Sequence, residues 1–105
     1  RVQSLDAKRQ RLDYIRKQIP ELENLAKEDL IMTCLFVMQE SLRFLKGEEF
    51  RQAEMLIREA MTETEGFVID PETGTMRKIL LGSARNNLKL TATILNFLIK
   101  IHILT

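Results

Sequence analysis

The chain has 105 residues, of which 45% are apolar and 30% are charged, and its formal net charge is +1. This length fits one domain with one core, and the composition excludes a wholly disordered chain and a fibrous repeat. A domain of this size buries only a modest fraction of its apolar surface, and many such proteins complete their core by forming oligomers.

Cellular location is indicated by the single cysteine and by the apolar stretches. Cys34 lies in an apolar run and has no partner for an internal disulfide, so we expect a small core residue in a reducing compartment. We expect no secretory signal, because the first residues are charged. The most apolar stretch, residues 88–104, contains Lys89, Asn96 and Lys100 and is shorter than the ~20 residues of a comfortable membrane span. These features predict a cytoplasmic protein with no membrane segment.

The N-terminal segment is basic. Residues 1–17 contain six basic and two acidic side chains, which gives this segment a net charge of +4. Three of its few apolar residues recur at helical spacing: Leu5, Leu12 and Ile15. The pattern predicts a basic helix over residues 1–19 with a narrow apolar stripe. Pro20 ends it, because proline disfavours the helical conformation in the preceding residue and cannot donate a backbone hydrogen bond.

Two further helices follow. Residues 20–46 begin with acidic side chains, which the helix dipole favours near an N-terminus. Apolar residues lie on more than one side of this helix: Leu30, Ile31, Cys34, Leu35, Phe36, Val37, Met38, Leu42, Phe44 and Leu45. Such a helix needs contacts on more than one face. Gly47 suits a C-terminal cap, and residues 48–65 form a third, amphipathic helix that Gly66 ends.

Residues 67–80 contain the only strand signal. Phe67-Val68-Ile69 and residues 75–80 flank the turn sequence Asp70-Pro71-Glu72-Thr73-Gly74. Proline presets one turn residue and glycine tolerates a positive φ, so the segment predicts a short, protruding β-hairpin.

A final helix is expected after the hairpin, with Ser83 as its N-cap. Residues 97–104 alternate in polarity, and their periodicity leaves both a helix and a strand open. The predicted fold is therefore mainly α: a small, oligomer-forming helical bundle with one short hairpin at about residues 67–80. It consists of the basic helix over residues 1–19 and a helical oligomerisation core over residues 20–105.

No catalytic constellation is visible. His102, the single histidine, has no neighbouring nucleophile, and the chain has no glycine-rich phosphate loop or metal-ligand spacing. The acidic turn at residues 70–74 lacks the alternating oxygen ligands of a calcium loop. We therefore expect a protein that is not an enzyme and that uses no cofactor and no metal.

The basic helix is the candidate for nucleic-acid contact, because clustered cations neutralise phosphates and release counterions. The predicted contacts are Lys8, Arg9, Arg11, Arg16 and Lys17. The alternative is a solvated face on which Asp6 and Asp13 form local pairs with Lys8, Arg9 or Arg16. In a ring of subunits, this helix would repeat and form a continuous basic collar.

The order of elements over residues 27–105 resembles the small subunit of the terminase, the DNA-packaging motor component of tailed bacteriophages. The similar features are the acidic helix start Glu28-Asp29-Leu30, the helix ending at Glu65-Gly66, the segment from Gly66 to Gly74, a closing helix with Asn86, Asn87, Leu88, Ile94, Leu95 and Asn96, and the terminal Leu104-Thr105. Ile103 stands where the family has glycine, and Ile79-Leu80-Leu81 where it often has proline.

The resemblance implies a ring-forming protein that binds viral double-stranded DNA in the host-cell cytoplasm and regulates the large subunit, which has the ATPase and nuclease activities. Excess apolar surface would then be buried between subunits. The expected interface residues are Ile31, Leu35, Phe36, Leu95 and Ile99. The alternative is a helical, dimeric adaptor or regulatory module that binds another protein and no DNA.

Overall fold

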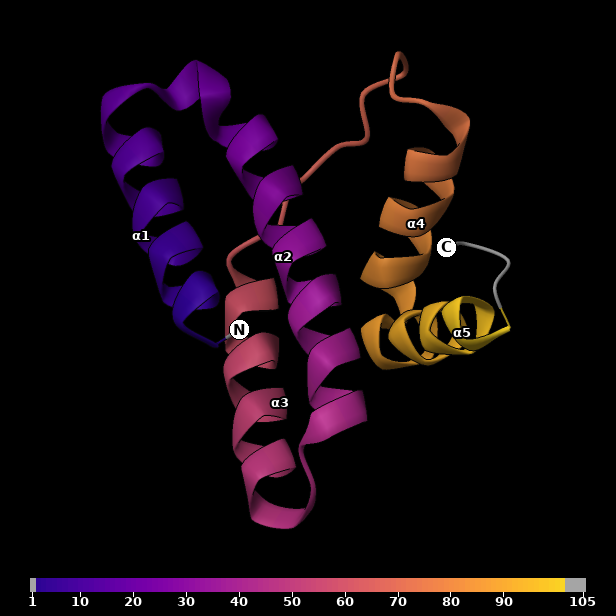
Figure 1. Cartoon of the computed structure of the whole chain (residues 1–105). Coiled ribbons are helices and arrows are strands. Elements are labelled where there is room, and N and C mark those ends of the chain that lie inside the picture. The colour runs from indigo at the N-terminus through magenta and orange to yellow at the C-terminus, as the bar shows by residue number, and fades with distance from the viewer. Residues whose placement is uncertain (1, 102–105) are drawn as a thin grey trace.

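The computed structural model describes residues 2–101, and this part of the chain is mainly helical, as predicted (Figure 1). The elements are α1 (Val2–Gln18), the short 3-10 helix η1 (Pro20–Leu22), α2 (Glu23–Phe44), α3 (Gly47–Thr62), α4 (Thr75–Asn86) and α5 (Leu88–Lys100). None of the described helices is both long enough and apolar enough to cross a membrane.

The breaks between the first three helices lie within a few residues of the predicted positions. Gly47 is the first residue of α3, however, and not the cap of α2, whose C-cap is Leu45. Ile19, which precedes Pro20, has φ −140° and ψ 65° and so leaves the helical conformation. Gly47 has φ 57° and Gly66 has φ 84°, values in the left-handed region that glycine adopts without steric cost. Local backbone chemistry therefore sets these boundaries.

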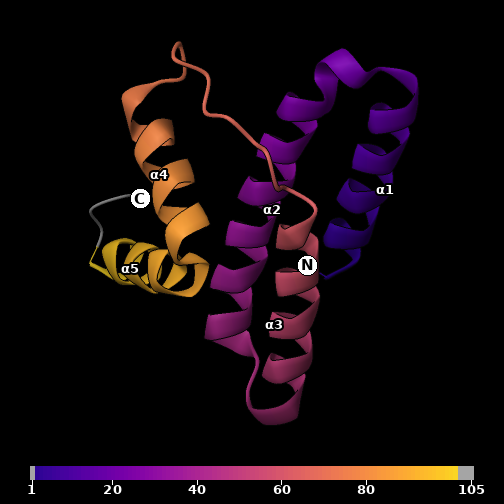
Figure 2. The ribbon, with the colours of Figure 1, turned by 180° about the vertical axis from the view of Figure 1, so that it is seen from behind.

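Helix α2 is the centre of the fold and contacts each of the other four α-helices. Helices α1, α2 and α3 run antiparallel in turn, and α1 and the α4–α5 pair lie on opposite sides of α2 (Figures 1 and 2). Helix α5 lies across the C-terminal half of α2. A helix with apolar residues on several sides is thus covered on more than one face, as expected.

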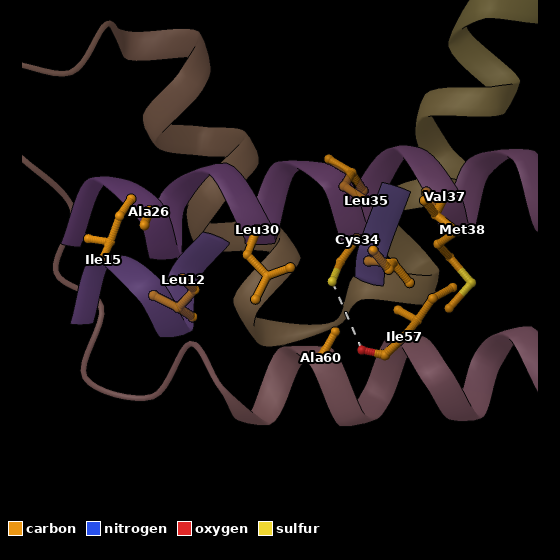
Figure 3. Packing of buried hydrophobic residues seen from close by; sticks show 12 residues of the cluster. Leu12, Ile15, Ala26, Leu30, Cys34, Leu35, Val37, Met38, Ile57 and Ala60 are labelled. Atoms are coloured by element: carbon orange, nitrogen blue, oxygen red, sulfur yellow. Dashed lines mark hydrogen bonds between the residues drawn. The ribbon is translucent and has the colours of Figure 1, made fainter. Parts of the chain in front are cut away.

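The main core cluster lies between α1, α2 and α3 (Figure 3) and extends to Ala92 of α5. Leu12, Leu30, Cys34 and Ile57 are fully buried in it. The Cys34 Sγ lies 4.0 Å from the carbonyl oxygen of Ile57, which places the thiol between α2 and α3. Burying each large apolar side chain stabilises the fold by about 1.5–3 kcal/mol. The apolar stripe of the basic helix therefore belongs to the core.

A second cluster covers the other face of α2. Ile31 and Met32 of α2 pack with Phe67 from the connection and with Leu81 and Ala84 of α4. This cluster attaches α4 to the rest of the domain.

The predicted hairpin is wrong. Residues 75–80 are the first half of α4, and within residues 2–101 the structure contains no strand. The Asn24 side chain occupies the place of a partner strand: its Nδ2 donates to the Val68 carbonyl oxygen at 2.8 Å, and its Oδ1 accepts from the Val68 backbone N–H at 2.9 Å. The turn itself forms, since the Asp70 carboxylate accepts from the Glu72 N–H at 2.8 Å. It leads into a helix because Leu81 and Ala84 bury one face of that helix against α2.

The single closing helix is also a wrong prediction, because α4 and α5 are separate helices. Asn87 lies between them with φ −155° and ψ 93°, and its side chain caps α5 by accepting from the Leu90 N–H at 3.1 Å. Ser83 is inside α4 rather than at an N-cap, and its hydroxyl lies 2.6 Å from the Thr91 hydroxyl, which ties α4 to α5. Residues 97–100 are helical, and residues 102–104 lie outside the described part of the chain.

Candidate assembly and nucleic-acid surfaces

One face of α5 packs against the chain's own core. Ala92 is fully buried, and Leu95 packs against the main cluster. Asn96 reinforces this contact, because its Nδ2 donates to the Gln39 carbonyl oxygen at 3.1 Å and its Oδ1 lies 3.4 Å from Gln39 Nε2. These contacts fix which side of α5 points away from α2.

The other face of α5 is apolar and open to solvent. Its side chains expose 54%, 48%, 60% and 45% of their surface and form what we name the α5 seam: Leu90, Ile94, Phe97 and Ile101. Their spacing alternates between four and three residues. This alternation is typical of a helix that packs along its length against another helix. Helix α5 is therefore apolar on both faces, while the described chain covers only one.

The predicted interface residues divide into two groups. Ile31 and Leu35 are fully buried within the chain, so they are core residues and the interface prediction is wrong for them. Leu95 packs against the same core. Phe36 and Ile99 are 56% and 37% exposed and remain candidates. The reason is that α4 and α5 cover the part of α2 that we expected a second subunit to cover.

The basic side chains of α1 form ion pairs inside the chain. Lys8 Nζ lies 2.8 Å from the Asp29 carboxylate of α2, and Arg11 reaches the same carboxylate at 3.7 Å. Lys17 pairs with Asp13 one turn earlier in α1, at 3.0 Å. A local pair thus forms within α1, but with Lys17, whereas the expected partners Lys8, Arg9 and Arg16 pair with carboxylates of α2 and α3.

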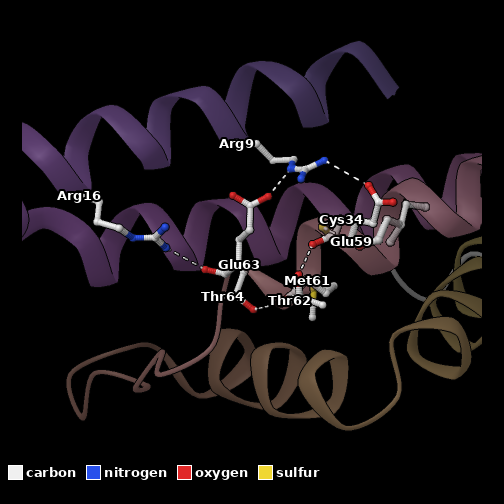
Figure 4. A network of polar contacts seen from close by, with 9 residues as sticks. Arg9, Arg16, Cys34, Glu59, Met61, Thr62, Glu63 and Thr64 are labelled. Atoms are coloured by element: carbon white, nitrogen blue, oxygen red, sulfur yellow. Dashed lines mark hydrogen bonds and ion pairs between the residues drawn. The ribbon is translucent and has the colours of Figure 1, made fainter.

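The two remaining predicted contacts join α1 to the end of α3 (Figure 4). Arg9 pairs with Glu63 and lies 3.8 Å from the Glu59 carboxylate. Arg16 lies 3.3 Å from the Glu23 carboxylate and donates to the Glu63 backbone carbonyl oxygen at 3.1 Å. All five cations that the sequence predicts as DNA contacts thus have a carboxylate within ion-pair distance. These carboxylates lower the positive electrostatic potential around α1.

The described residues form neither a metal site nor a reactive thiol. Within residues 2–101, no group of three or more His, Cys, Asp or Glu side chains is placed to bind a metal ion. Burial raises the pKa of the Cys34 thiol to about 12, so the thiol stays protonated at neutral pH and is a poor nucleophile.

A groove of about 440 Å³ lies between α3 and the junction of α4 and α5. Its lining includes Arg58, Arg85 and Lys89 together with Glu54 and Glu65. Glu54 pairs with Arg58 at 3.4 Å and with Lys89 at 3.7 Å. Glu54 therefore pairs with two of the three cations in this groove, and Arg85 is the third.

Comparison with known proteins does not identify a function for these surfaces. No protein-family model, curated protein or solved structure matches the chain significantly. Functional interpretation therefore depends on the α5 seam, on the distribution of charge and on the resemblance in the sequence.

Proposed function

We propose that this protein is a self-assembling subunit without enzymatic activity that recognises double-stranded DNA for viral genome packaging and regulates the large, ATP-hydrolysing and DNA-cleaving subunit of the packaging motor. The observation that supports self-assembly is the α5 seam. The DNA-recognition part is supported by the resemblance to the small terminase subunit, whose members form rings.

The seam supports assembly through its energetics. Complete burial of a large apolar side chain gains about 1.5–3 kcal/mol, so a side chain that is half exposed has about 1 kcal/mol still to gain. With four such side chains on each copy, contact between copies gains several kcal/mol on each side. Exposed Phe36 and Phe44 on α2 provide further apolar surface. The total is comparable to the cost of association, which lies between about 4 and 15 kcal/mol.

Assembly also bears on DNA binding. A single subunit with a net charge of +1 has little attraction for a polyanion. In a ring, every cation that faces the DNA is repeated in each subunit, and the binding free energies of the repeated contacts act together. The proposed function therefore needs the oligomer.

Two measurements test the proposal. Native mass spectrometry and light scattering are expected to show an oligomer at micromolar concentration, and titration with a DNA duplex is expected to show affinity that falls steeply between about 50 and 200 mM salt. A stable monomer would refute self-assembly. An oligomer with no measurable affinity for DNA would refute the DNA-recognition part alone.

A second candidate function is a dimeric adaptor that binds another protein and no DNA. The observation that favours it is the internal pairing of the α1 cations, which leaves the basic helix with a structural role in attaching α1 to α2 and α3. This candidate predicts a dimer by mass and no salt-dependent affinity for DNA, so the same two measurements separate the candidates.

A further inference from the structure

Charge is segregated along the chain in a way that the net value conceals. Residues 1–72 contain eleven basic and fifteen acidic side chains, a net charge of −4, whereas residues 73–105 contain five basic and no acidic side chains, a net charge of +5. All five of these cations lie on α4 and α5. Because α1 and the α4–α5 pair lie on opposite sides of α2 (Figure 2), the excess positive charge lies on the side away from α1.

The cations that lack an acidic partner are concentrated near the same side. Among residues 2–101, those with no carboxylate within 4.0 Å are Arg43, Lys46, Lys78, Arg85 and Lys100. Three of the five lie on α4 and α5, and Arg43 lies at the end of α2 that α5 crosses. This distribution is the reverse of the one that the sequence predicted, in which α1 held the available charge.

The two cations of α4 are placed to act together. Lys78 and Arg85 are seven residues apart. Two helical turns separate them, so they share one face and lie about 10 Å apart along the axis. Measured along the axis of the duplex, this separation corresponds to about three nucleotides of one strand, at 3.4 Å per nucleotide. The Arg85 guanidinium lies 5.5 Å from the centre of the Phe67 ring, and this contact orients it.

Lys100 and Arg43 meet at the other end of α5. Both line a groove of about 380 Å³, together with Asn96, Phe97 and Ile99, and none of the described residues that line it has a carboxylate. Each also lies in the last turn of its helix, where a cation complements the helix dipole. Lys78 has no such structural role: it lies in the first turn of α4, where the dipole disfavours a cation, and that turn contains no acidic residue.

A phosphate group meets different conditions on the two sides of the molecule. On α1 it must compete with carboxylates that already neutralise the cations, so contact releases few counterions from the DNA. Among the described residues, Lys78 and Arg85 of α4 and Lys100 of α5 have no carboxylate within 4.0 Å to compete with a phosphate, whereas Arg77 of α4 is paired with Glu28. We infer that Lys78, Arg85 and Lys100, with Arg43 beside them, contact the phosphate backbone of double-stranded DNA. This inference rests on the proposed function and replaces α1 as the site of contact.

The test compares two variants that remove the same number of charges. One is Lys78→Gln/Arg85→Gln/Lys100→Gln, and the matched control on α1 is Lys8→Gln/Arg11→Gln/Lys17→Gln. Affinity for a short DNA duplex is measured by fluorescence anisotropy between about 50 and 200 mM salt. The first variant is expected to lower the slope of log affinity against log salt by about 3, because each phosphate contact contributes about 0.9. The α1 variant is expected to keep the parent slope within about 1.

Mass and melting temperature, measured on both variants, show whether each remains folded and assembled. The inference is overturned if the α1 variant loses the slope and the α4–α5 variant keeps it, and the proposed function then still stands. It is also overturned if both variants lose slope equally, since total charge would then govern binding. If the parent oligomer binds vesicles of anionic lipid but no DNA, the DNA part of the proposed function fails together with this inference.

Discussion

Replacing Phe97 by alanine tests whether the α5 seam is an assembly surface. Phe97 lies near the middle of the seam and exposes 60% of its surface, so the side chain contributes little to the fold of a single chain. We expect Phe97→Ala to weaken assembly and to leave the fold of the separate chain intact.

The size of the effect follows from the exposed fraction of the ring. Full burial of a phenylalanine side chain gains about 1.5–3 kcal/mol, so covering the 60% that is exposed gains about 1–2 kcal/mol for each copy. Where two copies meet through their seams, both rings are lost, at a cost of about 2–4 kcal/mol. The dissociation constant of that contact is then expected to rise roughly 30- to 700-fold.

Sedimentation velocity over a dilution series measures this dissociation constant. Met55→Ala is the matched control, because Met55 is 64% exposed but lies on α3, outside the seam. We expect Met55→Ala to assemble as the parent does. Thermal unfolding below the dissociation constant should give the same midpoint for Phe97→Ala and the parent.

An unchanged dissociation constant for Phe97→Ala would refute the reasoning, and the apolar side chains of α5 would then be a solvent-exposed face. Equal weakening by both substitutions would also refute it, because the loss would not depend on the position of the seam. A lower melting midpoint in the separated Phe97→Ala chain would show that Phe97 belongs to the fold instead.

Three other predictions concern the fold itself. Cys34 should react with iodoacetamide about a thousandfold more slowly than an ordinary thiol of pKa 9.0, because its raised pKa of about 12 reduces the thiolate fraction by that factor. Comparable reaction rates in native and urea-unfolded protein would contradict this expectation. Gly66→Ala should lower the free energy of unfolding by about 1–2 kcal/mol, because Gly66 has φ 84°. Gly82 lies inside α4 with open space around it, so Gly82→Ala should raise the free energy of unfolding by about 0.5–1 kcal/mol. Denaturant unfolding measures both changes. The hydrogen bond from Lys27 lowers the pKa of Glu23 below 4.5, so the ion pair stabilises the fold above pH 4.5 and loses this effect as the pH falls through the lowered pKa. The stability lost in Glu23→Gln should therefore become smaller in acid. A loss that does not change with pH would contradict the assignment.

The first three helices follow from the sequence because their ends depend on neighbouring residues. Pro20 acts on the residue before it, and Gly47 and Gly66 adopt backbone angles that few other residues adopt. The segment after Gly66 does not follow in this way. The turn at residues 70–74 forms as expected, but the same turn chemistry can lead into a strand or a helix. The choice depends on Leu81, which packs against α2, about fifty residues earlier in the chain.

The candidate surfaces show the same limit. Counting charges over residues 1–17 suggests an available basic face, yet the partners of Arg9 are Glu59 and Glu63, which only the fold brings close. The 4-3-4 spacing of the α5 seam is visible in the sequence. Which face of α5 is covered is not visible there, since that depends on the packing of Leu95 against the core. The absence of acidic residues after residue 72 was the overlooked sequence signal for a positive surface.

The central position of α2 has a consequence for how the domain unfolds. Because α2 forms one wall of both apolar clusters, separating either α1 and α3 or α4 and α5 exposes α2 side chains that are buried in the native state. Each cluster therefore loses part of its packing when α2 separates from its neighbours. The two halves of the molecule are expected to lose structure in a single cooperative transition, reported alike by probes placed on α1 and on α5.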